Sequence, residues 1–165
     1  MEEVTVRGVC PEDLERVTAV EAVCFPAAEA ATRESFQERI AAFPEYFFVA
    51  EVQRGLIGFI NGCVTNSPVI FDEMFHSTSY HIPNGENLTV FGLTVIPEYR
   101  KQGVAAQLMQ HFIQTAKNTG KRKVILTCKE RLVPYYESFG YAYDGISAST
   151  HGGAQWFDMT LVLKP

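Results

Sequence analysis

The chain has 165 residues and a net charge of −5, and 47% of its residues are hydrophobic and 20% charged. This size and balance predict one folded domain, residues 1–165, and exclude a disordered chain. The longest basic run is the three residues 121–123. Together with the acidic balance, that short run argues against a nucleic-acid partner.

Nothing in the sequence indicates a membrane or secreted protein. No apolar run approaches the roughly 18 residues of a membrane span, and the acidic start Met1-Glu2-Glu3 is unlike a secretory signal. The four cysteines form no C-x-x-C pair, and their spacing fits neither a zinc site nor a disulfide scaffold. We therefore expect a cytoplasmic protein that binds no metal and no membrane.

The chain is predicted to begin with one strand and two helices. Residues 4–9 alternate as a strand does, and residues 12–24 follow Pro11 as a helix. Thr32 is typical of a helix N-cap, without the glutamate that would complete a capping box. Apolar residues at helical spacing then continue to Phe43.

A β-hairpin and a long loop are predicted next. Residues 46–52 and 56–64 have the composition of two strands that turn at Gly55. Residues 66–87 show no clean period and are predicted to be a loop, with one short helix over residues 71–75. Loops of this length in a compact domain are often functional lids.

The second half of the chain contains the clearest elements. Residues 88–96 are nearly all apolar or β-branched, which predicts a central strand. Residues 104–118 repeat apolar side chains every three or four positions, which predicts a helix. A strand over 124–128, a short helix over 132–139 and a final strand over 156–163 complete a mixed α/β sheet with helices on both faces.

A polar turn, Arg100-Lys101-Gln102-Gly103, joins the long strand to the long helix. A helix N-terminus offers unpaired N–H groups and a partial positive charge that suit a phosphate, and Gly103 permits a sharp turn close to an anion. On this motif alone a plain turn stays the alternative. Gly120-Lys121 lacks the other residues of a P-loop, and no G-x-G-x-x-G follows a strand.

Two stretches resemble a known family. The segment from Arg100 to Ala105 resembles the Arg/Gln-x-x-Gly-x-Gly/Ala signature of the GNAT acetyltransferase superfamily. Downstream, Val133-Pro134-Tyr135-Tyr136-Glu137-Ser138-Phe139-Gly140-Tyr141 resembles its short helix with a tyrosine followed by Phe-Gly-Tyr/Phe. The order of elements agrees over nearly the whole chain. Within the superfamily, residues 126–136 and 21–26 are similar to the arylalkylamine N-acetyltransferases.

This resemblance implies a GNAT fold, an α/β domain with a single mixed, mostly antiparallel central sheet. Its long strand would splay from its neighbour and leave a cleft for acetyl-CoA. Gly92 would form a bulge that frees the N–H of Leu93 to stabilise the oxyanion, and Leu93 and Val95 would pair with the pantetheine arm. The residues expected to bind acetyl-CoA are Leu93, Thr94, Val95, Arg100, Lys101, Gln102, Gly103, Val104, Ala105 and Ala106.

The resemblance also assigns catalytic roles. Tyr136 would protonate the leaving CoA thiolate, with Tyr135 and Tyr141 as the alternatives. Insect relatives use a glutamate just after the first helix as the base. That use favours Glu29 here, with Glu21 as the second candidate.

Other candidate groups are weaker. The two strand histidines of vertebrate serotonin N-acetyltransferases are replaced by Thr89 and Phe91, so that proton relay is missing. His76 and His81 of the long loop could reach the cleft. Cys128 fits a buried core cysteine better than an acyl-carrying nucleophile.

The implied function is direct transfer of an acetyl group from acetyl-CoA to a primary amine, a small arylalkylamine-like molecule. Aromatic residues of the 66–87 loop would either line a pocket for the amine or only fold the loop onto the domain. The alternatives are acetylation of a protein N-terminus, a lysine or an aminoglycoside, and a non-catalytic acyl-CoA sensor. Dimers are frequent in this superfamily, so a homodimer is one expected assembly.

Overall fold

The computed structural model describes residues 2–164, and Met1 and Pro165, the ends of the predicted domain, lie outside the described residues. The helices are α1 (Leu14–Cys24), α2 (Arg33–Ala42), α3 (Val104–Asn118) and α4 (Val133–Glu137). The strands are β1 (Thr5–Gly8), β2 (Phe47–Val52), β3 (Gly55–Asn61), β4 (Val64–Thr65), β5 (Asn87–Val90), β6 (Gly92–Val95), β7 (Lys123–Cys128), β8 (Ala142–Ile146) and β9 (Phe157–Val162). No helix within residues 2–164 has the length and apolar character needed to cross a membrane.

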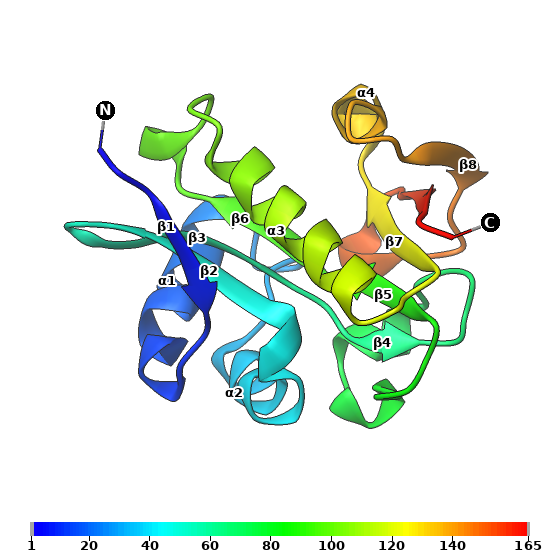
Figure 1. Ribbon diagram of the computed structural model, residues 1–165, viewed down its shortest axis with the longest axis horizontal. Coiled ribbons are helices and arrows are strands. Elements are labelled where there is room, and N and C mark those ends of the chain that lie inside the picture. Colours follow the sequence, from blue (N-terminus) through cyan, green and yellow to red (C-terminus); the bar gives the residue numbers. More distant parts are fainter. Residues whose placement is uncertain (1, 165) are drawn as a thin grey trace.

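The strands form two sheets (Figure 1), one in the order β1-β2-β3-β6 and one in the order β4-β5-β7-β9-β8. All pairs in the first sheet are antiparallel, and β5 and β7 are the parallel pair of the second. The predicted mixed, mostly antiparallel α/β fold is confirmed. The prediction of one unbroken strand over residues 88–96 is wrong, because β5 and β6 lie in different sheets and divide the central sheet in two.

The division occurs at Phe91. The N–H of Phe91 donates to the carbonyl oxygen of Asn61 at 2.7 Å, while Gly92 is the residue paired opposite Asn61. Two residues on one strand therefore oppose one on the other, which is a β-bulge, and a bulge bends and twists its strand. Before it the chain pairs with β7, and after it the chain pairs with β3.

The neighbouring strand breaks at the same level, so the predicted strand 56–64 is also divided. A Cβ atom on Gly62 would lie 1.7 Å from the carbonyl oxygen of Thr89, which only glycine avoids. The chain leaves the first sheet at Asn61 and joins the second as β4. The two breaks together allow the two sheets to diverge.

Helices cover both faces of the first sheet, as predicted. The ring of Phe36 on α2 lies 6.1 Å from Phe47 and 5.4 Å from Phe59, between ring centroids. On α3, the ring of Phe112 lies 6.3 Å from Phe48. Because Phe47 and Phe48 are neighbours on β2, their side chains point to opposite faces. Helices α2 and α3 therefore lie on opposite sides of the sheet (Figure 1).

Most predicted boundaries of helices and strands agree with the structure to within a few residues. The Oγ1 of Thr32 accepts a hydrogen bond of 3.1 Å from the N–H of Ser35, so the predicted N-cap is confirmed. Helix α1 begins at Leu14 rather than residue 12, because residues 11–13 form a 3-10 turn. Helix α4 ends at Glu137, earlier than predicted. Strand β8 was not predicted, because its residues are mostly exposed and carry little apolar alternation.

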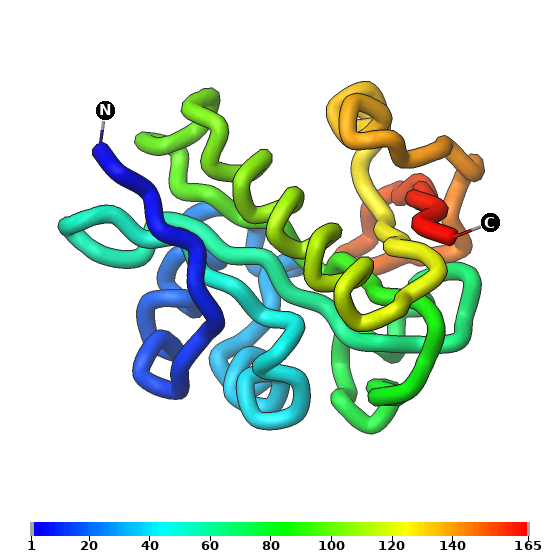
Figure 2. The backbone as a smooth tube through the Cα atoms, in the orientation of Figure 1, coloured from blue at the N-terminus to red at the C-terminus, as the bar shows by residue number. Residues whose placement is uncertain are grey.

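The predicted loop 66–87 contains two 3-10 turns, Asp72–Phe75 and Thr78–Tyr80. Figure 2 shows this segment, in the greens, at the β4–β5 side of the molecule. The carboxylate of Asp72 accepts hydrogen bonds from the hydroxyl of Ser149 and from the N–H of Thr150, the latter at 3.1 Å. These bonds hold the loop against the segment between β8 and β9.

Candidate functional site

Strand β6 has a free edge that faces away from β3. The N–H of Ile96 donates to the carbonyl oxygen of Ile57 at 3.0 Å, which sets the alternation of the antiparallel ladder. By that alternation the backbone groups of Leu93 and Val95 point outward from the sheet. The carbonyl oxygen of Val95 accordingly accepts a 2.9 Å hydrogen bond from Nε of Arg100. The prediction that these two residues offer their backbone to a ligand is compatible with this geometry.

The turn after β6 presents a helix N-terminus. Lys101 and Gly103 both have positive φ, 63° and 84°, and residues 101–103 are exposed. A Cβ on Gly103 would meet no atom within 4 Å, so glycine is favoured here by conformation and not by space. The first N–H groups of α3 have no partner within the helix and can bind an anion.

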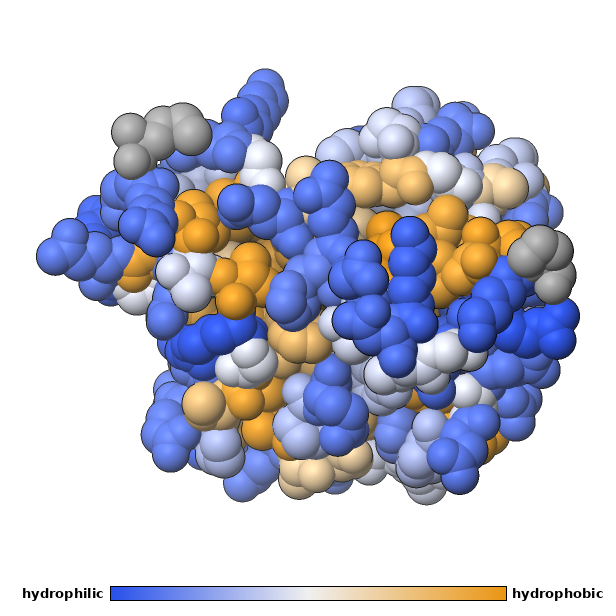
Figure 3. All heavy atoms as spheres, in the orientation of Figure 1, coloured by the Kyte–Doolittle hydropathy of each residue, from blue (hydrophilic) through white to orange (hydrophobic). Residues whose placement is uncertain are grey.

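A cavity of about 240 Å³ lies between β6 and β7. The cavity begins after Val90 and Leu126, the last residue pair between β5 and β7. Beyond that pair the chain continues as β6, which does not pair with β7. Phe91 and Leu93 form one wall, and Thr127 and Cys128 the other. Figure 3 shows the molecular surface notched between the start of α3 and α4, at the open end of the diverging sheets.

Aromatic rings form part of the cavity wall. Phe25, Phe75, Phe91 and Trp156 line it, and they come from four separate segments of the chain. The predicted contribution of the 66–87 loop is thus present through Phe75 and His76. Phe71 instead packs on Tyr80, with 5.2 Å between ring centroids.

Tyr136 of α4 lines the cavity and is 8% exposed, whereas its neighbour Tyr135 is 38% exposed. Burial raises the pKa of the Tyr136 phenol well above its ordinary value, and the nearby Cys128 and Tyr135 raise it further. The hydroxyl therefore stays protonated at neutral pH. The third tyrosine, Tyr141, is buried and donates to the sulfur of Met109 at 3.3 Å. Of the three, Tyr136 has the position that suits a proton donor.

Glu21, at the end of α1, is a buried carboxyl on the cavity wall, with 7% of its surface exposed. Its Oε2 accepts from the N–H of Ala31 at 2.9 Å, and its Oε1 accepts from the hydroxyl of Thr94 at 3.3 Å. Burial raises the pKa of Glu21, although the Ala31 hydrogen bond and Arg39 act against the shift. A carboxyl with a raised pKa is a suitable proton acceptor in catalysis.

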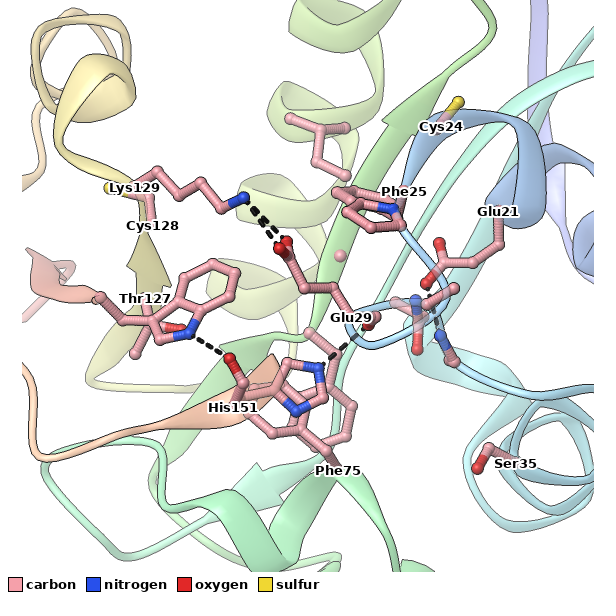
Figure 4. A pocket seen from close by; sticks show the side chains of 18 of the residues that line it. Glu21, Cys24, Phe25, Glu29, Ser35, Phe75, Thr127, Cys128, Lys129 and His151 are labelled. Carbon is pink, nitrogen blue, oxygen red and sulfur yellow. Dashed lines mark hydrogen bonds and ion pairs between the residues drawn. The ribbon is translucent and has the colours of Figure 1, made fainter. Parts of the chain in front are cut away.

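Glu29, the other predicted carboxylate, forms an ion pair. Nζ of Lys129 lies 2.9 Å from its Oε1 and donates to its Oε2 at 3.0 Å (Figure 4). Its backbone carbonyl lies 3.0 Å from Nε2 of His151. The Nε1–H of Trp156 in turn donates to the carbonyl oxygen of His151 at 2.8 Å. Glu29 thus ties three segments together over the cavity.

Of the two candidate histidines, His81 is placed differently from the prediction. His81 accepts a 3.0 Å hydrogen bond from the N–H of Val64 at its Nδ1 and packs on Phe43, so its predicted access to the cleft is wrong. His76 lines the cavity, as does His151, which was not a candidate. Thr89 is fully buried and donates to the carbonyl oxygen of Cys63 at 3.0 Å.

The sequence reasoning also missed Arg39 of α2. It is 5% exposed, yet it lines the cavity. Its Nη1 donates to Oδ1 of Asn61 and its Nη2 to the carbonyl oxygen of Phe75, both at 3.0 Å. A signal was available, because Arg39 stands three positions after Phe36 and beside Ile40, on the apolar face of the helix. Lys129 and Trp156, by contrast, carried no local signal.

Comparison with known proteins was consistent with this geometry. The model of the acetyltransferase (GNAT) family matches residues 14–141. The chain is 27% identical over 110 residues to serotonin N-acetyltransferase of Mesocricetus auratus, a match that covers 66% of this chain and 52% of that enzyme. The chain therefore spans about half the length of this curated relative.

Solved structures share the fold. The GphF GNAT-like decarboxylase in complex with isobutyryl-CoA superposes with a TM-score of 0.85 at 18% identity, over 97% of this chain and 100% of that one. The putative acetyltransferase yncA of Salmonella typhimurium, with its cofactor acetyl-CoA, gives a TM-score of 0.72 at 17% identity over 98% and 94%. Both of these similar structures have acyl-CoA ligands.

Proposed function

The chain belongs to the acetyltransferase (GNAT) family, and on this premise we propose that it transfers the acetyl group of acetyl-CoA to a primary amine in the cavity. The observation that carries the proposal is the free edge of β6, whose outward backbone groups lie between the exposed Gly103 turn and the cavity with Tyr136. That arrangement supports the proposal of an anion site and a thioester site in line.

The co-substrate would lie along this edge. The N–H groups from Lys101 to Ala106 would hold the pyrophosphate, because they stand at or before the first turn of α3. Leu93 and Val95 would pair with the amide groups of the pantetheine arm as an added strand does. Arg100 supports the site indirectly, since its Nε already binds the carbonyl oxygen of Val95 at 2.9 Å and joins the turn to the strand.

The reaction would occur at the start of β6. The N–H of Leu93, just after the bulge at Gly92, would donate to the oxyanion that forms when the amine attacks the thioester carbon. The Tyr136 hydroxyl would give its proton to the departing thiolate sulfur. Because the amine attacks the thioester directly, no covalent enzyme intermediate is required.

At neutral pH the amine is protonated, and it must lose one proton before its nitrogen can attack the thioester. Of the two predicted carboxylates, the arrangement favours Glu21, because both oxygens of Glu29 face Lys129. Glu21 would accept the proton, directly or through water. Glu29 would then act by holding the 26–31 loop and Lys129 over the cavity.

The aromatic wall supports a small amine with an apolar body. A volume of about 240 Å³ bounded by Phe25, Phe75, Phe91 and Trp156 suits an aromatic ring. The similar enzyme of Mesocricetus auratus is named for serotonin, an arylalkylamine. We therefore place arylalkylamine-like molecules first among the acceptors.

The experiment is to follow thiol release from acetyl-CoA with tryptamine, phenethylamine, polyamines and short peptides. We expect turnover with the arylalkylamines and an acetylated amine identified by mass spectrometry. Turnover with peptides alone would overturn the proposed acceptor. Binding of acetyl-CoA with no thiol release above buffer for any acceptor would replace the transferase proposal by a sensor.

A further inference from the structure

Arg39 is a buried cation that protein groups satisfy only in part. Its guanidinium has five N–H donors, and within residues 2–164 it donates to one side-chain oxygen of Asn61 and one carbonyl oxygen of Phe75. The rings of Phe91 and Phe36 lie 4.8 and 5.5 Å from its central carbon. Three N–H groups have no acceptor within residues 2–164, and the residue lines the cavity.

No carboxylate of the described residues neutralises this charge at contact distance. The ion pairs within 4.0 Å involve other residues. Glu21 is near enough to interact electrostatically with Arg39, but it is bonded to Ala31 and Thr94. Burial lowers the pKa of Arg39 to about 10, so the side chain is still a cation at neutral pH.

The charges on the cavity wall show which groups have no contact partner within residues 2–164. The wall carries the cations Arg39, Lys129 and Arg131 and the carboxylates Glu21 and Glu29. Lys129 and Glu29 neutralise each other, and Arg131 is exposed. This leaves Arg39 and Glu21 as the buried charges of the cavity wall, and among the described residues they share no hydrogen bond or ion pair. A buried guanidinium whose N–H groups lack acceptors is costly, and a bound anion would supply them.

The place of Arg39 relates it to the reacting centre. Asn61, which accepts its hydrogen bond, is paired in the sheet with Gly92. Gly92 precedes Leu93, whose N–H is the proposed oxyanion donor. An anion held by Arg39 would thus lie beside the acyl group and the attacking amine.

We propose that Arg39 is a carboxylate-binding subsite, whose guanidinium pairs with a carboxylate on the amine acceptor or on the acyl group of the CoA thioester. A guanidinium matches a carboxylate in a two-pronged geometry, which fixes the orientation of the bound molecule. On the acceptor, the carboxylate would make the preferred substrate an arylalkylamine that also carries a carboxylate, which is an aromatic amino acid. The inference rests on the proposed function for the position of the thioester.

The test measures binding by calorimetry, independently of turnover. In one arm, protein saturated with CoA is titrated with L-tryptophan and L-phenylalanine, each against its carboxamide, which lacks only the charge. In the other arm, malonyl-CoA is compared with acetyl-CoA. We expect the carboxylate to tighten binding about tenfold or more in at least one arm. The arm that shows the preference identifies which molecule carries the carboxylate.

Three variants test whether the preference comes from the subsite. Arg39→Gln is expected to reduce it to less than about threefold. Arg33→Gln is the matched control, since it removes the same charge from an exposed side chain of the same helix and should leave the preference intact. Arg39→Lys keeps the positive charge but loses the planar pair of N–H donors, so its preference for the carboxylate should lie between those of the wild type and Arg39→Gln.

Equal binding of acid and neutral counterpart in both arms of the wild-type protein would overturn the proposal, even if Arg39→Gln fails to fold. A preference that survives in a folded Arg39→Gln protein would overturn it as well. Failure of the thiol-release assay would reject the proposed function but not the subsite, because the calorimetric comparison requires no turnover.

Discussion

Substituting Tyr136 by phenylalanine removes one hydroxyl group from the cavity and leaves the aromatic ring in place. That ring packs beside Tyr135 and Tyr141, with centroid distances of 5.3 and 6.0 Å. Among residues 2–164, no hydrogen bond to the Tyr136 hydroxyl is formed, in contrast to the Tyr141 hydroxyl on Met109. The substitution therefore breaks no protein hydrogen bond.

Because the Tyr136 hydroxyl makes no hydrogen bond to the described residues, its removal should affect the reaction rate and not the stability of the protein. Since no bond is lost, Tyr136→Phe should change the free energy of unfolding by less than about 0.5 kcal/mol, and Tm by no more than about 2 °C. Loss of a general acid should lower kcat about 100-fold. Tyr141→Phe is the control, and should cost about 0.5–1 kcal/mol of stability with kcat unchanged.

The assay is thiol release at saturating acetyl-CoA and amine, with Tm measured on the same samples. Because burial raises the pKa of Tyr136 above its ordinary value of 10.0, the hydroxyl stays protonated and the rate defect should be the same at pH 7 and pH 9. Retention of more than about a third of the wild-type kcat by Tyr136→Phe would refute its role as proton donor. An equal loss of kcat in Tyr141→Phe would point to packing instead.

Three further substitutions test the fold and the site. Gly103→Ala must adopt φ 84° in open space, so it should cost about 1 kcal/mol and lower Tm by about 2–4 °C in calorimetry. Gly62→Ala would place Cβ 1.7 Å from the Thr89 oxygen, and we expect no folded protein by circular dichroism; a native spectrum would contradict the bulged geometry. Glu21 has a raised pKa in the folded state, so it stabilises the fold below pH 4.5 and this contribution is lost as pH rises through the folded pKa. Glu21→Gln should therefore raise Tm relative to wild type at pH 7 but not at pH 4, while it slows thiol release; a lower Tm at pH 7 would contradict the assigned shift.

Elements with a strong local period were predictable. The predicted helix 104–118 is α3 with the same bounds, because its apolar stripe repeats at helical spacing over four turns. The turn before it is present, with positive φ at Lys101 and Gly103. The N-cap at Thr32 also follows from a single side chain and its own backbone.

Features that depend on two distant segments were not predictable. The apolar run 88–96 is compatible with one strand, and only its contact with Asn61 on one side and β7 on the other divides it at Phe91. Strand β8 forms because β9 offers it an edge, and its own residues have a weak strand pattern.

The site shows the same limit. Tyr136 could be proposed from its motif, and Glu21 and Glu29 from their place after the first helix. The different environments of Glu21 and Glu29 could not be predicted, because the ion pair of Glu29 with Lys129 joins residues a hundred positions apart. The burial of Glu21 likewise depends on the 26–31 loop that folds over it.

The sequence by itself determined the family, and it led to the predictions of a phosphate-binding helix N-terminus and of Tyr136 as the proton donor, because each of these depends on a short contiguous segment. Only the tertiary structure decided that the sheets diverge at Phe91 and Gly62, and that Arg39 is buried in the cavity between Asn61 and Phe75. The physical reason is that steric exclusion, burial and charge balance are properties of groups brought together from separate segments, and such groups leave little trace in the local order of residues.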